Sequence, residues 1–543
     1  MTVSPTGVGR AAGLVLLVCG VLLVGCGSNT SELWGRSGEL WDPAGRLPDF
    51  SYAGYHAGEQ PIPEVPVAAS VRDFGAVGDG VTDDTQAFRR AIATVERGAI
   101  FIPAGRYIIT QPLFIRRSHV VLRGESRDST VLFFPKSLRE VLGKGRDGGP
   151  SGWSWGGGWI WLNADLKTGD SNGPVWDEGE LLSELALDGA KGDTSVVVAS
   201  TAGITAGQWV RLVQNESDGS LSLALHAGYE LKRKCSISRP DHQIVNWVVQ
   251  VQRVEGDRVH FDRPLRGPTR RAWRARLVEA VPPVEEVGIE HLTIEFQLRP
   301  YRGHHKEPGQ NAISFGSAFN SWVDDVAIVH ADNGIFFWYA RYCTVRNVVL
   351  GGRGGHYGFN MGGAQDSLLT RFRIENLSVH DTSNANLGNG NVMSWGVGQE
   401  INFDHHRSAA HQNLYSQIDV GKVTRMWRSS VTHSGHYAGG YETFWNIQPL
   451  ATTESFRSLV AMNVIGKILM SPRASSKWYG AWIEQVEDLQ PLDLHAAQLA
   501  RRLGTVMPGR PELPPPLPAG VGDSDVAGPS AALGVRPAQA SAQ

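Results

Sequence analysis

The second half of the chain contains a repeat of short apolar segments, and this repeat constrains the fold more than any other feature. The segments VGIEHLTI, WVDDVAIV, TVRNVVL and LLTRFRIENL share the spacing apolar-x-x-apolar-x-apolar. Val326, Val348 and Phe372 occupy the same position in three successive segments. Short strands that recur at a nearly constant period of this size are typical of a solenoid in which each repeat forms one coil. We therefore expect an all-β fold with its main solenoid over residues 284–490.

Residues 71–110 predict a helix that precedes the first coils. Asp83, followed three residues later by Gln86, matches a capping box, and Gly98 marks the expected end of the helix. The apolar residues that share one face of this helix are Ala87, Phe88, Ala91, Ile92 and Val95. Two strands should follow, separated by the turn at 103–105. We expect residues 67–185 to form an N-terminal cap and the first coils.

Two further regions interrupt the repeat pattern. Four tryptophans alternate at period two in 153–161, which suits either sugar stacking or one inward-packed face: Trp153, Trp155, Trp159 and Trp161. Residues 186–283 contain β segments with Gly-Asp turns and predict a small inserted β subdomain.

Both ends of the chain differ in composition from the middle. Residues 491–507 contain an amphipathic helix that stops at Gly504, which we expect to close the solenoid. The Pro- and Ala-rich residues 508–543 predict a disordered tail. Residues 27–66 are rich in Gly, Pro and Ser and predict a flexible tether.

Residues 1–26 have the pattern of an export signal. Arg10 precedes an apolar run that is short for a membrane span and ends in Leu23-Val24-Gly25-Cys26, which looks like a bacterial lipobox. We expect Cys26 to carry lipid and the mature chain to be anchored on the extracellular face of the bacterial membrane. Cys235 and Cys343 are then the cysteines left for one disulfide.

Composition excludes several classes of protein. The mean hydropathy of -0.20 excludes a polytopic membrane protein. The net charge of -3 gives no basic surplus, so we expect no nucleic-acid partner.

The stretch VRDFGAVGDGVTDDTQAFRRAI resembles the first cap of the pectate-lyase-like superfamily of right-handed parallel β-helices. The resemblance covers residues 68–135, and 284–470 by the repeat pattern. It implies a polysaccharide partner, because the superfamily includes polysaccharide lyases, C5-epimerases, glycoside hydrolases and phage tailspikes. The paired-Asp signature of polygalacturonases is absent, and FDHHR at 403–407 only loosely resembles the epimerase motif. The resemblance also suggests calcium, although no compact set of carboxylates is visible, so no metal site or cofactor is assigned.

The densest group of titratable residues lies in 398–427. In an extended strand, His405 and Arg407 project to one face and Asp404 and His406 to the other. A uronate lyase needs a base and a cation that neutralises the substrate carboxylate, and a histidine beside an arginine supplies both. We therefore predict cleavage of an acidic polysaccharide by β-elimination. The candidate catalytic residues are His405, Arg407, His406, Asp404 and His411.

Further residues are candidates for substrate binding. His304 and His305 lie in a loop between coils and are expected to line the same groove. The others are Lys422, Arg425, Tyr415 and Trp445, of which either Tyr415 or Lys422 is a candidate donor to the leaving oxygen.

Two other functions remain open. A glycoside hydrolase needs two facing carboxylates, and the sequence offers Asp366, Asp381, Glu400, Asp404 and Asp419. A non-catalytic glycan-binding surface protein also suits the lipid anchor and the tryptophans.

Overall fold

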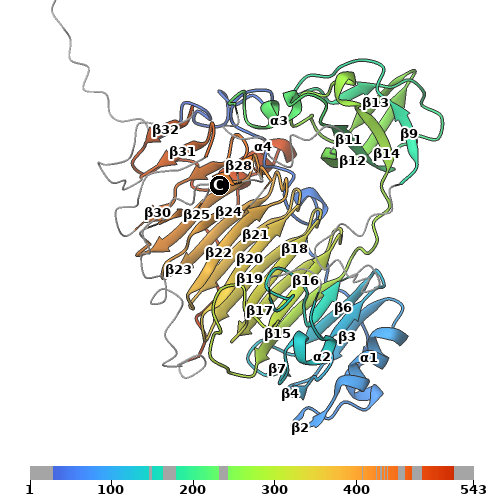
Figure 1. Cartoon of the computed structure of the whole chain (residues 1–543), viewed down its shortest axis with the longest axis vertical. Coiled ribbons are helices and arrows are strands. Elements are labelled where there is room, and N and C mark those ends of the chain that lie inside the picture. Colours follow the sequence, from blue (N-terminus) through green and yellow to red (C-terminus); the bar gives the residue numbers. More distant parts are fainter. Residues whose placement is uncertain are drawn as a thin grey trace, which may run out of the picture.

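Parallel strands stacked in coils form the body of the protein. The computed structural model describes residues 29–145, 150–162, 179–230, 243–406, 408–423, 425–428, 431–432, 435–436, 438–449, 459–467 and 480–518. Two parallel sheets run along the coils (Figure 1). This arrangement confirms the predicted right-handed parallel β-helix with an inserted β subdomain.

The longer sheet contains one strand of nearly every coil. In spatial order its strands are β1 (Val67–Ser70), β3 (Gly98–Ile102), β6 (Val120–Gly124), β15 (Gly288–Phe296), β17 (Trp322–Val329), β19 (Thr344–Gly351), β21 (Leu368–Ile374), β23 (Val392–Gly398), β25 (Leu414–Gly421), β29 (Thr443–Trp445), β31 (Asn463–Gly466) and β32 (Trp482–Gln485). Strands that join this path from the side are β2 (Asp79–Asp83), β4 (Gly105–Ile108), β7 (Thr130–Phe134) and β30 (Gln448–Pro449).

The shorter sheet takes the next strand of each coil. In spatial order its strands are β5 (Leu113–Ile115), β8 (Ile160–Leu162), β16 (Asn311–Gly316), β18 (Asn333–Trp338), β20 (Gly355–Gly362), β22 (Ser378–Ala385), β24 (Phe403–His406) and β26 (Trp427–Arg428). A two-stranded sheet of β27 (Val431–Thr432) and β28 (Gly435–His436) follows.

The register of the coils follows the repeat in the sequence. Val326 pairs with Val348, and Val348 pairs with Phe372, so the predicted period is confirmed. These three side chains are buried in one continuous core between the two sheets. Single bridges form a third ladder at the turn after each shorter-sheet strand, through Phe319, Arg341, Gln365, Asn389 and His411.

The N-terminal cap contains the predicted helix, with different ends. Helix α1 (Thr85–Thr94) buries Ala87, Phe88, Ala91 and Ile92 as expected. Its N-cap is Asp84 rather than Asp83, and the predicted capping box is absent because the Asp84 carboxylate accepts from the amides of Val77 and Gly78. The helix ends at Thr94, before Gly98. Short helices nearby are η1 (Tyr55–Gly58), η2 (Val71–Phe74) and α2 (Leu138–Leu142).

The alternating tryptophans belong to the interior. Trp153, Trp159 and Trp161 are buried in the main core, and Trp159 donates from Nε1 to the carbonyl of Gly309. Inward packing therefore explains the period-two pattern for these three residues.

The inserted subdomain is an antiparallel sheet beside the coils (Figure 1). Its strands and helices are β9 (Leu181–Glu184), β10 (Ser195–Val197), β11 (Trp209–Asn215), α3 (Ser220–Leu225), β12 (Gln243–Glu255), β13 (Arg258–Phe261), η4 (Arg271–Trp273) and β14 (Arg276–Glu279). Asp366, fully buried in a coil turn, forms ion pairs with Arg263 and Arg266 of the insertion. Trp209 stacks on Tyr342 of the coils, so charge and packing both fix the subdomain in place.

The N-terminal segment is packed against the coils, which contradicts the predicted tether for residues 29–66. Trp34 and Phe50 are buried against Val392 and Leu414, because the outer face of the longer sheet offers apolar side chains there. Arg46 donates to Asn463 and to nearby carbonyls. This segment covers part of the longer sheet.

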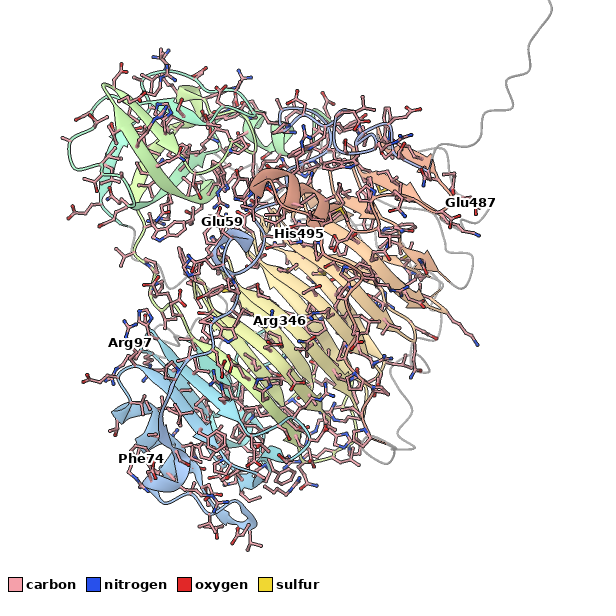
Figure 2. All side chains as sticks on the ribbon, turned by 180° about the vertical axis from the view of Figure 1, so that it is seen from behind. Glu59, Phe74, Arg97, Arg346, Glu487 and His495 are labelled. Carbon is pink, nitrogen blue, oxygen red and sulfur yellow. The ribbon has the colours of Figure 1, made fainter. Side chains whose placement is uncertain are left out.

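Helix α4 (Leu494–Leu503) ends at Gly504 as predicted, in a left-handed conformation. It lies against the side of the coils rather than closing their end, since Leu492 accepts from Gln417 of β25 and Arg502 pairs with Glu59 (Figure 2). Part of the predicted disordered tail contacts the coils instead, since the Pro514 carbonyl accepts from Arg373 and the Leu517 amide donates to Glu375. The rest of the predicted tail lies outside the described residues. Among the helices that are described, none has the length and apolar character needed to cross a membrane.

Candidate functional site

Strand β24 separates the predicted catalytic residues by face. His405 is 0% exposed and points inward, where its Nε2 lies 3.3 Å from Glu442 Oε2 and 3.3 Å from the Tyr415 hydroxyl. Phe403 lies two residues before His405 and packs in the core. Because side chains two residues apart in a strand lie on the same face, His405 also points into the core. The prediction that His405 contacts substrate is therefore wrong. Arg407 lies outside the described residues.

The predicted substrate-binding residues in 415–445 differ in burial. Tyr415 and Trp445 are fully buried, and the Trp445 indole donates to the carbonyl of Pro491, so neither can contact a polymer outside the coils. Lys422 and Arg425 are exposed in the connection from β25 to β26. Cys343 is a buried free thiol, whereas Cys26 and Cys235 lie outside the described residues.

Asp404 and His406 point outward and meet the predicted loop histidines on the shorter sheet. We call this cluster the histidine face; it consists of His304, His305, His356, His380, Asp404 and His406. The ring centroids of His304 and His356 are 4.6 Å apart, and those of His380 and His406 are 5.3 Å apart. The sequence prediction that the 304–305 loop shares a surface with Asp404 and His406 agrees with this geometry. The functional role of these residues stays a prediction.

Two carboxylates lie behind the imidazoles of the histidine face. Asp404 Oδ2 is 3.3 Å from His380 Nδ1, 3.4 Å from His406 Nδ1 and accepts from the Ser383 hydroxyl at 3.1 Å. Glu307 Oε1 lies 3.4 Å from His356 Nδ1 and accepts from the Tyr301 hydroxyl at 2.7 Å. His356 and Glu307 are fully buried.

Burial and crowding set the charges of this cluster. Burial, with three neighbouring imidazoles, lowers the pKa of His304 to about 4 and that of His356 well below its usual value. Burial alone would raise the pKa of Asp404, but the contacts with His380 and His406 lower it well below its usual range. At neutral pH the Asp404 carboxylate is therefore ionised, and the imidazoles of His304 and His356 are neutral.

His356 and His380 are functional candidates that the sequence analysis did not include. Tyr357 and His380 are paired in register and their rings stack at 4.8 Å, which places His356 and His380 on neighbouring coils. The signal was present in the repeat, because positions 356, 380 and 404 are equally spaced in the sequence.

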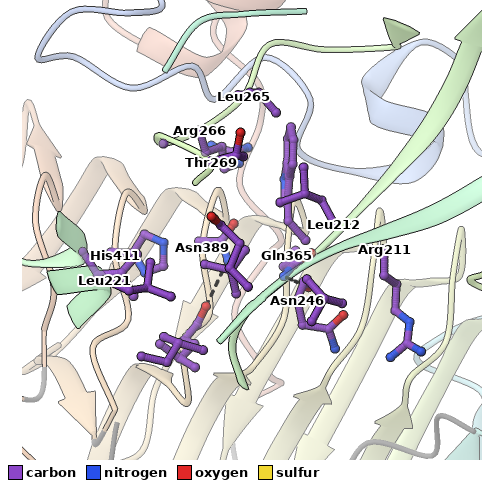
Figure 3. A pocket seen from close by; sticks show the side chains of 18 of the residues that line it. Arg211, Leu212, Leu221, Asn246, Leu265, Arg266, Thr269, Gln365, Asn389 and His411 are labelled. Carbon is purple, nitrogen blue, oxygen red and sulfur yellow. Dashed lines mark hydrogen bonds between the residues drawn. The ribbon is translucent and has the colours of Figure 1, made fainter. Parts of the chain in front are cut away.

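A cavity of about 980 Å³ lies between the inserted subdomain and the coil turns. We call it the basic cavity. Figure 3 shows Leu212 and Asn246 of the inserted sheet together with Gln365, Asn389 and His411 of the coil turns. The cationic residues that line it are Lys191, Arg211, Arg266, Arg276 and Arg341, and the described lining contains no Asp or Glu.

Several of these cations are bonded to uncharged oxygens. Arg276 donates to the side-chain carbonyl of Asn215 at 3.0 Å, and the Lys191 ammonium donates to the carbonyl of Gly45. Burial, helped by the charge of Arg266, lowers the pKa of Lys191 to about 8. Carbonyl and amide oxygens leave the positive charge of these side chains uncompensated, so the cavity favours an anion.

His411 lines the basic cavity and is the one predicted catalytic residue found there. Its Nδ1 lies 2.9 Å from the carbonyl of Ala409, which makes Nδ1 the donor and leaves Nε2 as the acceptor of a neutral ring. Burial lowers its pKa to about 4, with a contribution from the Arg266 charge. Arg266 is positioned beside it, since its carbonyl accepts from Gln412 and its guanidinium pairs with Asp366.

The carboxylates proposed for hydrolysis do not share one accessible face. Asp366 is fully buried and paired with two arginines, and burial raises the pKa of Asp381, which is bonded to Asn402, to about 7. Glu400 is exposed, whereas Asp404 lies on the histidine face. Asp419, in β25, is half-buried.

Calcium does not fit the candidate metal ligands. The groups of three potential ligands found in the described part of the chain are His304–His356–His380 and His380–Asp404–His406. Calcium prefers oxygen ligands, and these groups contain one carboxylate among five side chains.

A family model and curated relatives each match a minor part of the chain. Residues 68–147 match the family model described as rhamnogalacturonase A/epimerase, pectate lyase-like. A glucan 1,3-beta-glucosidase of Cochliobolus carbonum is 30% identical over 161 residues, which are 27% of this chain and 18% of that protein. A pre-neck appendage protein of Bacillus phage B103 is 32% identical over 120 residues, which are 22% of this chain and 11% of that protein. The chain thus spans less than a fifth of the length of these relatives.

Solved structures with a similar fold have low sequence identity. The tailspike protein gp49 of Pseudomonas phage LKA1 is 12% identical, with a TM-score of 0.47, covering 73% of this chain and 63% of that chain. The mannuronan C-5 epimerase AlgE4 A-module of Azotobacter vinelandii is 12% identical, with a TM-score of 0.30, covering 77% of this chain and 97% of that chain.

Proposed function

We propose that this chain, a parallel β-helix protein of the pectate-lyase-like superfamily, is a carbohydrate-active enzyme that cleaves a uronate-containing polysaccharide by β-elimination in the basic cavity. The observation that carries the proposal is the lining of this cavity, with five cationic residues and no described carboxylate. A polymer with a carboxylate on each uronate ring complements that charge.

The arrangement of His411 and Arg266 supports elimination over other reactions. Nε2 of neutral His411 takes the proton from C5 of a uronate ring, and a double bond forms between C4 and C5 as the bond from C4 to the leaving oxygen breaks. The Arg266 guanidinium stabilises the negative charge that develops on the carboxylate. The Tyr441 hydroxyl, which lines the same cavity, returns a proton to the leaving oxygen.

The proposed reaction still uses a histidine base and an arginine cation, but these are not the residues predicted from the sequence. A histidine beside an arginine was expected from His405 and Arg407 in one strand. His411 of a coil turn and Arg266 of the inserted subdomain now take those roles, because they lie together at a cavity whereas His405 is buried in the core.

The test is a panel of uronate polymers incubated with the purified chain. Elimination gives unsaturated uronates, which absorb in the ultraviolet, and Tyr441→Phe should slow their release. New reducing ends without this absorbance would show hydrolysis, and binding without either product would show a glycan-binding protein. Both outcomes would overturn the proposed reaction.

We also propose that the protein is exported and anchored by lipid on Cys26. The lipobox-like end of the apolar run supports this. Labelling of the expressed protein with a fatty acid should depend on Cys26, and labelling that persists in Cys26→Ser would contradict the anchor.

A further inference from the structure

Several imidazoles are grouped on the outer face of the shorter sheet. Among the described residues, His304, His356 and His380 each offer a ring nitrogen within 4.8 Å of the others. His304 comes from a loop, whereas His356 and His380 come from β20 and β22. Residues distant in sequence are thus brought to one point.

Buried ring nitrogens in this group lack hydrogen bonds. His356 is 0% exposed and His380 is 7% exposed, yet Nε2 of each ring is buried without a hydrogen-bond partner. Burying a polar atom without a partner costs free energy, so unsatisfied groups of this kind call for a ligand. Two such rings beside each other on neighbouring coils indicate a shared ligand.

A carboxylate stands behind each buried ring. Glu307 Oε1 lies 3.4 Å from Nδ1 of His356, and Asp404 Oδ2 lies 3.3 Å from Nδ1 of His380. In metal sites, a ligating histidine usually directs its second nitrogen to a carboxylate, which fixes the ring and raises its basicity. With Nδ1 of each ring near a carboxylate, Nε2 is the nitrogen that remains for a metal.

We propose that the histidine face binds one zinc ion through the imidazoles of His304, His356 and His380. Three histidine ligands match zinc sites that keep a fourth position open, and exposed His304 places that position toward solvent. Asp404 acts behind His380 rather than as a ligand, since its Oδ2 already contacts Ser383, His380 and His406.

The site is separate from the proposed reaction. None of its three ligands lines the basic cavity, and its existence does not depend on the substrate. Zinc binding and polysaccharide cleavage can therefore be tested independently.

The test is a zinc titration of the full chain. The protein is stripped with a chelator, its thiols are blocked, and zinc is added in competition with a chromophoric chelator. We expect one equivalent to bind, and cobalt in its place to give the visible absorption of a four-coordinate site.

Variants locate the ion. His304→Ala, on an exposed loop, should lose stoichiometric binding while circular dichroism stays unchanged, and His356→Ala and His380→Ala should do the same if they fold. Asp404→Asn should weaken binding about 10- to 100-fold, as expected for a residue behind a ligand. His411→Ala is the matched control and should bind like the parent.

Two results would overturn the site. One is the absence of a stoichiometric equivalent in the parent chain. The other is binding in His304→Ala equal to that of the parent.

Discussion

The basic cavity and the histidine face are built on the same coils and have opposite chemistry. Strands β20, β22 and β24 carry the imidazoles, and the turns that follow these strands line the cavity through Gly363, Asn386 and Ser408. The described lining of the cavity contains cations and no carboxylate, whereas the histidine face contains imidazoles backed by Glu307 and Asp404. One set suits an anion and the other a cation.

The two regions differ in the parts of the chain that form them. Stacked strands alone supply most of the histidine face, with His304 added from a neighbouring loop. The basic cavity exists only because an inserted subdomain is fastened over the turns through Asp366. A regular solenoid can therefore acquire a second site when an insertion covers one of its ladders.

The largest effect that is confined to one of the two regions should come from His411→Gln, in the basic cavity. Glutamine can keep the bond to the Ala409 carbonyl but cannot act as the base, so turnover of a uronate polymer should fall by about 10²- to 10⁴-fold. Zinc binding should not change. Release of unsaturated product is the measurement, and His291→Ala, on the opposite sheet, is the control. Parental turnover in His411→Gln would remove this residue from the mechanism.

Asp366→Asn should break the cavity while leaving the histidine face intact. Removing one partner of a buried ion pair costs about 3–5 kcal/mol of stability, because the two arginines lose their compensating charge. Urea denaturation measures the loss. Arg253→Ala breaks an exposed pair with Glu255 and should cost less than about 1 kcal/mol. Equal losses in the two variants would contradict the role given to Asp366.

The affinity of the cavity for an acidic oligosaccharide should fall as the pH rises through about 8. The Lys191 ammonium is charged below that pKa and neutral above it, so the anion loses one favourable charge on the alkaline side. Calorimetric titration at several pH values is the measurement. Lys191→Gln should bind more weakly at neutral pH and lose this alkaline step, and a step that persists would assign it to another group.

The smallest effect is expected from Ser383→Ala. The hydroxyl donates to Asp404 at 3.1 Å. Loss of this hydrogen bond removes about 1 kcal/mol of the interaction that orients the Asp404 carboxylate. Zinc affinity should fall by about fivefold. Ser394→Ala removes a hydroxyl contact on the other sheet and should leave zinc affinity unchanged. A drop as large as that of Asp404→Asn would show that Ser383 does more than orient the carboxylate.

Sequence periodicity predicted the coils and the separation of faces in β24 correctly. Val326, Val348 and Phe372 stack as expected, and Asp404 and His406 leave the strand opposite His405. The prediction that His405 contacts substrate was wrong, although buried Phe403 marks the inner parity of that strand in the sequence. Partners inside, such as Glu442, come from a later coil and gave no local signal.

The sequence by itself determined the stacked strands, their period and the alternation of side chains, because these follow from backbone geometry and from apolar burial repeated at fixed spacing. The tertiary structure alone decided that Arg266 of an insertion meets His411 of a turn, and that the segment 29–66 is packed on the longer sheet. Such contacts join residues far apart in the chain, and their formation depends on complementary shape and charge between whole surfaces.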